Sequence, residues 1–383
     1  MEESASLAQK QDYLARALRR WADRLEPVAG PRAAERLGYR DRVTLTARWS
    51  DGNGWRFGLM RRDELIAIHD CPVHTARVRA LVHALVQHLP RGGELPLAYL
   101  HVAGAQATLV VKSHHVDHEI LSRAVEALGG TGLEGLWLHL HPAAGRKLFA
   151  RSGWRHLWGA PQSRDPHGLL HGPTAFMQAF PRLHRESLLA AREYLGPGPG
   201  TSVLDLYCGL GGTLREWTRA GGRSLGVELS GEAVKFAALN APDATVLRGT
   251  CVQRLPQIRA WWSERSEPCV AYVNPPRSGL EAEVTASLAE ELRPARIAYL
   301  SCSAGTLARD LESFEAAGYS LDRIVPYDFF PLTHHVETLA LLERRQQRPG
   351  DGGGAAGRNP SLPCRSLLHI LSSGKYERSR FIV

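Results

Sequence analysis

One cysteine lies at a turn where a protein could use it as a reagent. In residues 299–311, "YLSCSAGTLARDL", Cys302 ends a strand-like apolar run and precedes a helix-like run. A thiol in such a place either packs as a small hydrophobic group or reacts as a thiolate. A thiol with an ordinary pKa of about 8.5 is only a few per cent ionised at neutral pH. We therefore expect the N-terminus of the following helix to favour the thiolate.

A glycine turn and a later acid form a second chemical pattern. Residues 203–212, "VLDLYCGLGG", are an apolar strand that ends in a glycine turn before a helix, without the spacing of a P-loop. Glu228 ends another strand-like run, "LGVELS", about 20 residues later. In doubly wound folds an acid at that position hydrogen-bonds the two hydroxyls of a ribose. An acid suits a ribose without a phosphate, such as that of S-adenosylmethionine or NAD.

The elements that must position these residues alternate along the chain. From residue 173 the pattern repeats strand, turn and helix, which predicts a mostly parallel, doubly wound sheet. Residues 6–27 form an amphipathic helical pattern, and short strands with one helix follow over 40–170. We predict an N-terminal helix (1–37), an α+β domain (38–172), a doubly wound domain (173–345) and a low-complexity tail (346–383).

Composition limits the classes of protein. The chain has 383 residues, 44% hydrophobic and 22% charged, with no apolar run near the roughly 20 residues that cross a bilayer. Its N-terminus lacks the apolar core of a signal peptide, so the sequence predicts a cytosolic protein without membrane contact. The net charge of +8 fits a polyanionic partner such as nucleic acid. The six cysteines form no C-x-x-C pair, which disfavours a disulfide framework or a zinc ribbon.

A third motif, "VNPPRSGL" (273–280), decides between families. Asn-Pro-Pro after a strand is similar to the motif of amino-methylating enzymes, but those place an aromatic residue where this chain has Arg277. Together, "AFMQAF", "DLYCGLGG", "VELS", "NPPRSGL", "LSCSAGTLARDL" and "FPLTHHVETLALLER" resemble the RNA uracil-C5 methyltransferase family, which makes ribothymidine in transfer or ribosomal RNA. The resemblance implies a Rossmann-like class I methyltransferase domain preceded by a smaller α+β domain.

The family chemistry explains two residues. C5 of uracil is too weak a nucleophile to take a methyl group, so a thiolate adds to C6, C5 is methylated, and a base removes the C5 proton before the thiolate leaves. By this resemblance Cys302 is the nucleophile and Glu337, in "HHVET", is the base. A carboxylate in a closed, partly apolar site has its pKa raised toward neutrality, which suits that role.

The resemblance also implies a binding site for the methyl donor, S-adenosylmethionine. Its residues are Gln178 with Phe176 close by, Tyr207, Gly209, Glu228 for the ribose, and Asn274 near the amino-acid end and the target base. Arg277 either holds an RNA phosphate, orients its loop or is a surface residue, and His334 and His335 either touch RNA or pack below the base. The target uracil must leave its stack to enter the site, at a cost of a few kcal/mol.

The chain departs from the family in several places. Many members carry an N-terminal barrel and a [4Fe–4S] cluster, but only Cys71 of the four ligands has a counterpart, so we expect neither. Asn274 replaces the usual aspartate, and Thr250 stands where an acid commonly meets the adenine. Ser303 and Ala304 replace the asparagine and proline that follow the family's cysteine.

Several alternatives remain at the level of sequence. The glycine turn favours the ribosomal RNA branch over transfer RNA, and we expect a monomer. A cytosine-C5 RNA methyltransferase also uses a cysteine, but its second cysteine would fall where this chain has "NPPRSG". The leading hypothesis is a uracil-C5 RNA methyltransferase, and the four departures leave open a weakened, re-targeted or catalytically silent RNA-binding homologue. His114 and His118 have i, i+4 spacing but no third ligand, which favours polar surface over a metal site.

Overall fold

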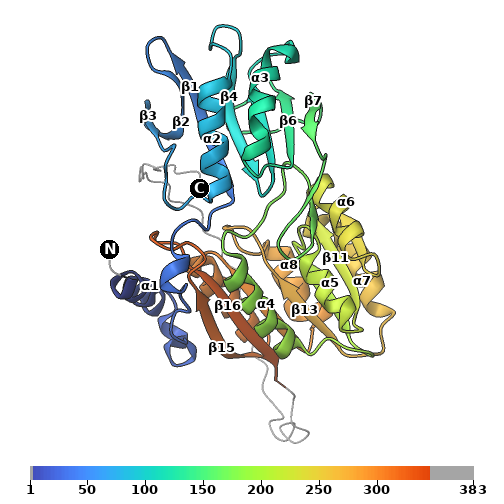
Figure 1. Cartoon of the computed structure of the whole chain (residues 1–383). Helices are drawn as coiled ribbons and strands as arrows, with labels where there is room; N and C mark the ends of the chain where they lie inside the picture. Colours follow the sequence, from blue (N-terminus) through green and yellow to red (C-terminus); the bar gives the residue numbers. More distant parts are fainter. Residues whose placement is uncertain (1–2, 346–383) are drawn as a thin grey trace, which may run out of the picture. The chain divides into compact units, whose positions relative to one another are not determined.

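Two seven-stranded sheets organise the residues that the structure describes, 3–345 (Figure 1). The structure is a computed structural model, and within it these residues form one unit. The predicted tail, 346–383, lies outside the described residues. None of the helices in the described part is both long and apolar enough to cross a membrane.

The first sheet has the strand order β3-β2-β1-β4-β5-β6-β7. Its strands are β1 (Arg42–Ser50), β2 (Gly54–Arg61), β3 (Glu64–Ala67), β4 (Leu97–Ala103), β5 (Gln106–Val111), β6 (Gly135–Leu140) and β7 (Trp154–Gly159). Helices α2 (Ala76–His88) and α3 (Ser122–Glu126) pack on one face, where alternate residues such as Leu100, Leu109 and Leu138 are fully buried. The opposite face of this sheet carries His101 from β4 and Trp137 and His139 from β6. A two-stranded ribbon, β8 (Ser163–Arg164) and β9 (Leu170–His171), leads out of this sheet.

The second sheet has the order β12-β11-β10-β13-β14-β16-β15. Its strands are β10 (Ser202–Leu206), β11 (Arg223–Glu228), β12 (Thr245–Arg248), β13 (Cys269–Val273), β14 (Arg296–Ser301), β15 (Tyr319–Tyr327) and β16 (Glu337–Arg344). The first five are parallel, whereas β16 runs antiparallel to both β14 and β15. The predicted doubly wound, mostly parallel sheet is confirmed.

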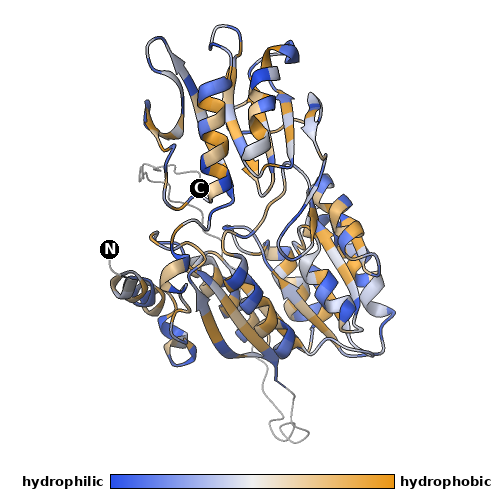
Figure 2. Ribbon diagram, viewed as in Figure 1, coloured by the Kyte–Doolittle hydropathy of each residue, from blue (hydrophilic) through white to orange (hydrophobic). Residues whose placement is uncertain are grey.

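Helices cover both faces of the second sheet. They are α4 (Pro181–Leu195), α5 (Gly212–Arg219), α6 (Gly231–Asn240), α7 (Cys251–Ser263), α8 (Ala282–Ala286) and α9 (Ala304–Ala316). Residues of α4 and α5 share one buried core, and residues of α7, α8 and α9 share the other. The strands between them are accordingly almost wholly hydrophobic, as Figure 2 shows, because both faces exclude water.

The N-terminal helix, α1 (Glu3–Ala17), packs with the second sheet although the first sheet follows it in the chain. Leu14 and Leu18 are fully buried in the same core as α9. Lys10, 2% exposed, forms a buried ion pair with Asp328, which follows β15. The domain boundaries at 37/38 and 172/173 stay predictions.

Candidate active site

The predicted site residues meet because parallel strands share one carboxyl edge. Tyr207 and Gly209 follow β10, Asn274 follows β13, and Cys302 follows β14. β10 and β13 are neighbours on which the chain reverses its winding direction, and ligands of open α/β sheets bind in the crevice there. Glu337 begins β16 and reaches the same edge because that strand is antiparallel.

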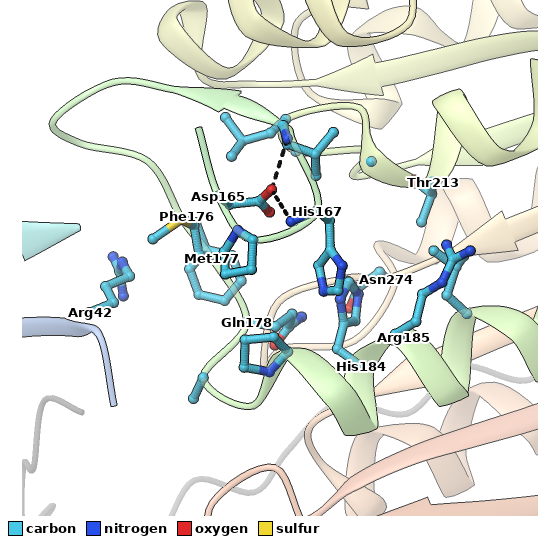
Figure 3. A pocket seen from close by; sticks show the side chains of 18 of the residues that line it. Arg42, Asp165, His167, Phe176, Met177, Gln178, His184, Arg185, Thr213 and Asn274 are labelled. Atoms are coloured by element: carbon cyan, nitrogen blue, oxygen red, sulfur yellow. Dashed lines mark hydrogen bonds between the residues drawn. The ribbon is translucent and has the colours of Figure 1, made fainter. Parts of the chain in front are cut away.

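A cavity of about 330 Å³ opens at this edge (Figure 3). Five residues expected at the donor site line it: Phe176, Gln178, Tyr207, Gly209 and Asn274. Phe176 is 60% exposed, a large exposure for a phenylalanine, and its ring lies 5.0 Å from the Arg42 guanidinium. The cavity therefore joins segments that are far apart in the sequence.

Three other predicted residues do not line this cavity: Glu228, Cys302 and Glu337. Glu228 is nevertheless tied to its wall, because Glu228 Oε2 accepts a hydrogen bond from the Gly209 N–H at 3.2 Å. Its other oxygen accepts from the Ser230 N–H at 2.7 Å. The carboxylate is thus held directly beside the glycine turn that follows β10.

The residues present fit a nucleoside-containing donor. Gly209 has a left-handed φ of +54°, and a Cβ there would meet no atom within 4 Å, so the turn leaves open space beside the cavity. Tyr272 lines the cavity, and its buried hydroxyl has no hydrogen-bond partner among residues 3–345. A carboxylate and two carboxamides, Glu228, Gln178 and Asn274, supply the polar groups at the edge that a ribose and an amino-acid moiety need.

Thr250 acts on the helix rather than on the cavity. Its hydroxyl oxygen accepts a hydrogen bond from the Gln253 N–H at 3.1 Å, and the Gln253 side chain accepts from the Thr250 N–H at 3.2 Å. This reciprocal cap satisfies two backbone donors at the start of α7. The departure at Thr250 thus has a structural use in helix α7.

Sheet register places Cys302 beside Glu337. The antiparallel pairing of β14 with β16 ends at Ser301 and Thr338, which directly adjoin Cys302 and Glu337 in the sequence. The two side chains are therefore close enough for the Glu337 carboxylate to raise the pKa of the thiol. Glu337 is 5% exposed, and burial raises its pKa to about 7, which confirms the expected direction.

The expectation for the thiol is wrong in direction. Burial raises the pKa of Cys302 to about 11, and the nearby Glu337 carboxylate raises it further, while the Arg277 guanidinium lowers it. Desolvation of the thiolate therefore outweighs the start of α9. Ser303, the N-cap of that helix, makes no side-chain capping bond.

Arg277 is the cation of this cluster. It lowers the pKa of both Cys302 and Glu337, and its Nη2 donates to His335 Nε2 at 3.4 Å. Burial lowers the pKa of His335 to about 4, so this ring is neutral and accepts the bond. The His334 and His335 rings contact each other in a tilted arrangement, with centroids 4.1 Å apart.

The turn that carries Cys302 is braced without the asparagine and proline of the family. The Ser301 hydroxyl accepts from the Ser303 N–H at 3.2 Å. Thr306 Oγ1 lies within hydrogen-bond distance of the Ser303 carbonyl, at 3.2 Å, and of the Arg277 carbonyl, at 3.4 Å. Thr306, which sequence analysis missed, therefore links the cysteine turn to the arginine loop.

Other residues of the site were also beyond sequence analysis. The cavity wall includes Asp165 and His167 from the β8–β9 turn and His184 and Arg185 from α4. No sequence motif marks these four residues. Asp165 and His167 reach the cavity only because the β8–β9 ribbon folds back to it, and His184 and Arg185 only because α4 packs beside it. Asp205, in the motif "VLDLY", is fully buried, accepts a bond from Trp217 Nε1 at 2.8 Å, and has its pKa raised to about 7 by burial.

Cys71, His114 and His118, which the sequence analysis considered as metal ligands, do not come together in one cluster. Within residues 3–345 no group of three or more His, Cys, Asp or Glu side chains is arranged to hold a metal ion. Cys71 is a half-buried free thiol. His114 and His118 are exposed, and His114 lies outside any helix.

The fold and the site define a Rossmann-like methyltransferase. A model of the tRNA (uracil-5-)-methyltransferase family matches residues 253–345. The chain is 30% identical to an uncharacterized RNA methyltransferase of Parasynechococcus marenigrum, over 90% of this chain and 78% of that one. It is 31% identical to the 23S rRNA (uracil(1939)-C(5))-methyltransferase RlmD of Pseudomonas fluorescens, over 88% and 75%. A tRNA (uracil-54, C5)-methyltransferase of Pyrococcus abyssi shares the fold, with a TM-score of 0.69 at 20% identity, covering 89% and 84%.

The chain therefore belongs to the RNA uracil-C5 methyltransferase family. It is an S-adenosylmethionine-dependent enzyme whose substrate is RNA.

Proposed function

We propose that the chain methylates C5 of a uridine in ribosomal RNA, with Cys302 as nucleophile and Glu337 as base. The observation that carries this proposal is the register of β14 and β16, which brings the Cys302 thiol close to the buried Glu337 carboxylate at the sheet edge that also bears the cavity. Two relatives that match most of the chain, at 31% and 28% identity, are named 23S rRNA methyltransferases, whereas the structural neighbour named as a tRNA methyltransferase is 20% identical; the closer sequences favour ribosomal over transfer RNA.

The donor would be held by Gln178, Tyr207, Gly209, Glu228 and Asn274, and when bound it supplies an electrophilic methyl group. Two of these residues are oriented by hydrogen bonds: the Glu228 carboxylate accepts from the Gly209 N–H, and the Tyr207 hydroxyl donates to the Glu281 carboxylate. Asn274 is uncharged, so this chain binds the donor without the carboxylate that the family usually has there.

The reaction on uracil uses the cluster at β14 and β16. Cys302 Sγ, as a thiolate, forms a bond to C6, and the electron pair of the C5–C6 double bond moves to C5, which then takes the methyl group. Glu337 removes the C5 proton, the double bond re-forms, and the C6–Sγ bond breaks to release the thiolate. A base with a pKa of about 7 is suited to accept a proton at neutral pH.

Arg277 supports this sequence by its charge. With a pKa of about 11, Cys302 is almost wholly protonated in the ligand-free protein, so a cation beside it is needed when the thiolate forms. Arg277 lowers the pKa of that thiol, and its bond to neutral His335 orients it. This gives Arg277 a positioning and electrostatic role that the sequence left open.

The test is methyl transfer to defined RNA. The enzyme is incubated with labelled S-adenosylmethionine and unmodified 23S rRNA or tRNA transcripts, and the RNA is digested to nucleosides. Label in 5-methyluridine from 23S rRNA supports the proposal. Label in 5-methylcytidine would make the chain a cytosine-C5 enzyme, and an unlabelled product with intact RNA binding would make it a silent homologue.

A second experiment tests the two residues. RNA that contains 5-fluorouracil lacks the C5 proton, so the enzyme should stay covalently attached to it. Cys302→Ala should abolish this adduct, while Glu337→Gln should keep it and slow product release from ordinary RNA. A Cys302→Ala enzyme that methylates at the normal rate would disprove the assignment of the nucleophile. The expected monomer stays a prediction for light scattering.

A further inference from the structure

The loop between β6 and β7, together with the start of β7, carries a cluster of cations that forms no ion pair among the described residues. Residues 141–156, "HPAAGRKLFARSGWRH", hold four cations and no Asp or Glu: Arg146, Lys147, Arg151 and Arg155. All four are exposed, and none forms an ion pair with any residue in the part of the chain that the structure describes. We call residues 141–156 the basic segment. Uncompensated like charges repel one another, so such a segment fits a polyanionic partner.

The basic segment is held in place on the sheet. The Ala150 N–H donates to His139 Nε2 at 2.9 Å, and Trp154 Nε1 donates to the Ala150 carbonyl at 3.0 Å. The Phe149 ring packs between His101 on β4 and Trp154, with centroids 5.1 and 5.3 Å apart. His139 is fully buried and its pKa is lowered to about 4, so it accepts as a neutral ring. The cations are thus displayed from a fixed loop.

Aromatic rings of the basic segment lie on the face of the first sheet opposite its helices. His156, exposed on the edge strand β7, packs on half-buried Trp137 with ring centroids 4.8 Å apart. Trp154 stacks on His139 at 4.1 Å. Cations that meet phosphates, together with rings on which bases stack, are the combination that binds RNA strands.

The basic segment is connected to the wall of the cavity through strands β7 and β8. β7 is the edge strand of the first sheet (Figure 1) and continues through β8 to Asp165 and His167, which line the cavity. The fully buried Gln106 fixes this connection, because its amide donates to the Ala160 carbonyl at 3.0 Å and to Ser163 Oγ at 2.8 Å. RNA phosphates held by this surface would lie along the segment that leads to the site.

We propose that Arg146, Lys147 and Arg151, with the His156–Trp137 platform, form the surface that docks the RNA substrate, the cations binding phosphates and the rings stacking on an unpaired base. This inference rests on the proposed function for the identity of the RNA. The inference goes beyond the proposed function because it assigns RNA binding to the loop between β6 and β7 and to the adjoining rings of the first sheet.

The strand β7 offers a matched control. Arg155 has the same charge and exposure class as Arg151, but it pairs with Leu138, whose side chain is buried on the helix-covered face. Alternation along the strand therefore turns Arg155 away from the face that bears His156. Loss of Arg155 should leave RNA binding nearly unchanged.

The experiment measures binding of an unmodified 23S rRNA transcript over a range of salt. Each lost phosphate contact lowers the slope of log K against log salt by about 0.7 to 0.9, so R146A/K147A/R151A should lower it by about 2 to 3 and weaken binding at least tenfold at low salt. R155A should change both by little. His156→Ala should weaken binding several-fold at all salt concentrations with an unchanged slope, because stacking releases no counterions. S-adenosylhomocysteine affinity, which checks folding, should be the same in all variants.

The outcomes separate this inference from the proposed function. A triple variant with wild-type slope and affinity would overturn the docking surface, as would an R155A variant that loses as much slope per charge as the triple variant. If the wild type binds the transcript through this surface but forms no 5-methyluridine, the proposed function fails and the docking surface stands. R146K/R151K, which keeps the charges, should retain the salt slope.

Discussion

Glu337 raises the pKa of the Cys302 thiol and Arg277 lowers it, so the direction and the size of the pKa change can be predicted for a variant of each residue. With a pKa of about 11, Cys302 is about 0.1% ionised at pH 8, against about a quarter for a thiol with an ordinary pKa of about 8.5. The thiolate of a higher-pKa thiol is more nucleophilic, which offsets about tenfold of that difference. Alkylation of Cys302 in the ligand-free protein at pH 8 should therefore be about 20-fold slower than that of an ordinary exposed thiol.

The two variants should move the midpoint of alkylation in opposite directions. Unit charges within about 4 to 6 Å of each other, at an effective dielectric constant of about 20, interact by about 3 to 4 kcal/mol, or about two to three pKa units. Because Cys302 is partly exposed, Glu337→Gln should lower the thiol pKa by about one to two units. Arg277→Gln should raise it by less than about one unit, since Arg277 is exposed and water screens its charge.

The assay is iodoacetamide labelling as a function of pH, followed by mass spectrometry of the peptide that contains Cys302. Cys269 is the internal control, because burial also raises its pKa to about 11 but its charged neighbours are Glu267 and Arg265. Its midpoint should not change between the variants. A wild-type midpoint for Cys302 at or below about 8.5, or shifts of the same sign in both variants, would refute the electrostatic account of this cluster.

The remaining predictions concern the base, the glycine turn and the N-terminal helix. Single-turnover release of methylated RNA from the covalent adduct should rise with pH through about 7 as Glu337 loses its proton, and Arg277→Gln should move that midpoint to higher pH because the guanidinium lowers the carboxyl pKa; a midpoint near 4.5 would contradict the burial of the base. Gly211→Ala should destabilise the fold by more than Gly209→Ala in thermal unfolding. Both have left-handed φ, which costs about 1–2 kcal/mol for alanine, but only at Gly211 would a Cβ meet a neighbouring backbone atom, at 2.8 Å. Lys10→Met should lower the free energy of unfolding by about 3–5 kcal/mol, because it leaves a buried carboxylate without its cation, and an unchanged denaturant midpoint would contradict this.

The binding-surface proposal adds a physical reason for the charge of the whole chain. The net charge of +8 did not by itself say where RNA would bind. In the structure many arginines are paired, as Arg259 is with Glu291 and Arg182 with Glu35, and these pairs neutralise themselves locally. The basic segment has no such partners among the described residues, so its charge remains available to phosphates.

The order of strands and helices was the part that the sequence determined by itself. Alternation of apolar strands with amphipathic helices from residue 173 requires a parallel, two-sided sheet, and parallel strands bring their carboxyl ends to one edge. That alone places Tyr207, Asn274 and Cys302 near one another. Family resemblance supplied their expected roles, which local pattern could not supply.

Only the tertiary structure decided how the groups act on one another. Glu337 lies close to Cys302 because β16 runs antiparallel to β14. The register between these two strands cannot be predicted from the sequence of either strand alone. The pKa of the thiol rises rather than falls because desolvation depends on everything that covers it, not on the adjacent helix. The cavity walls at Asp165 and Arg185, and the contact between His156 and Trp137, likewise arise from packing between segments that share no local pattern.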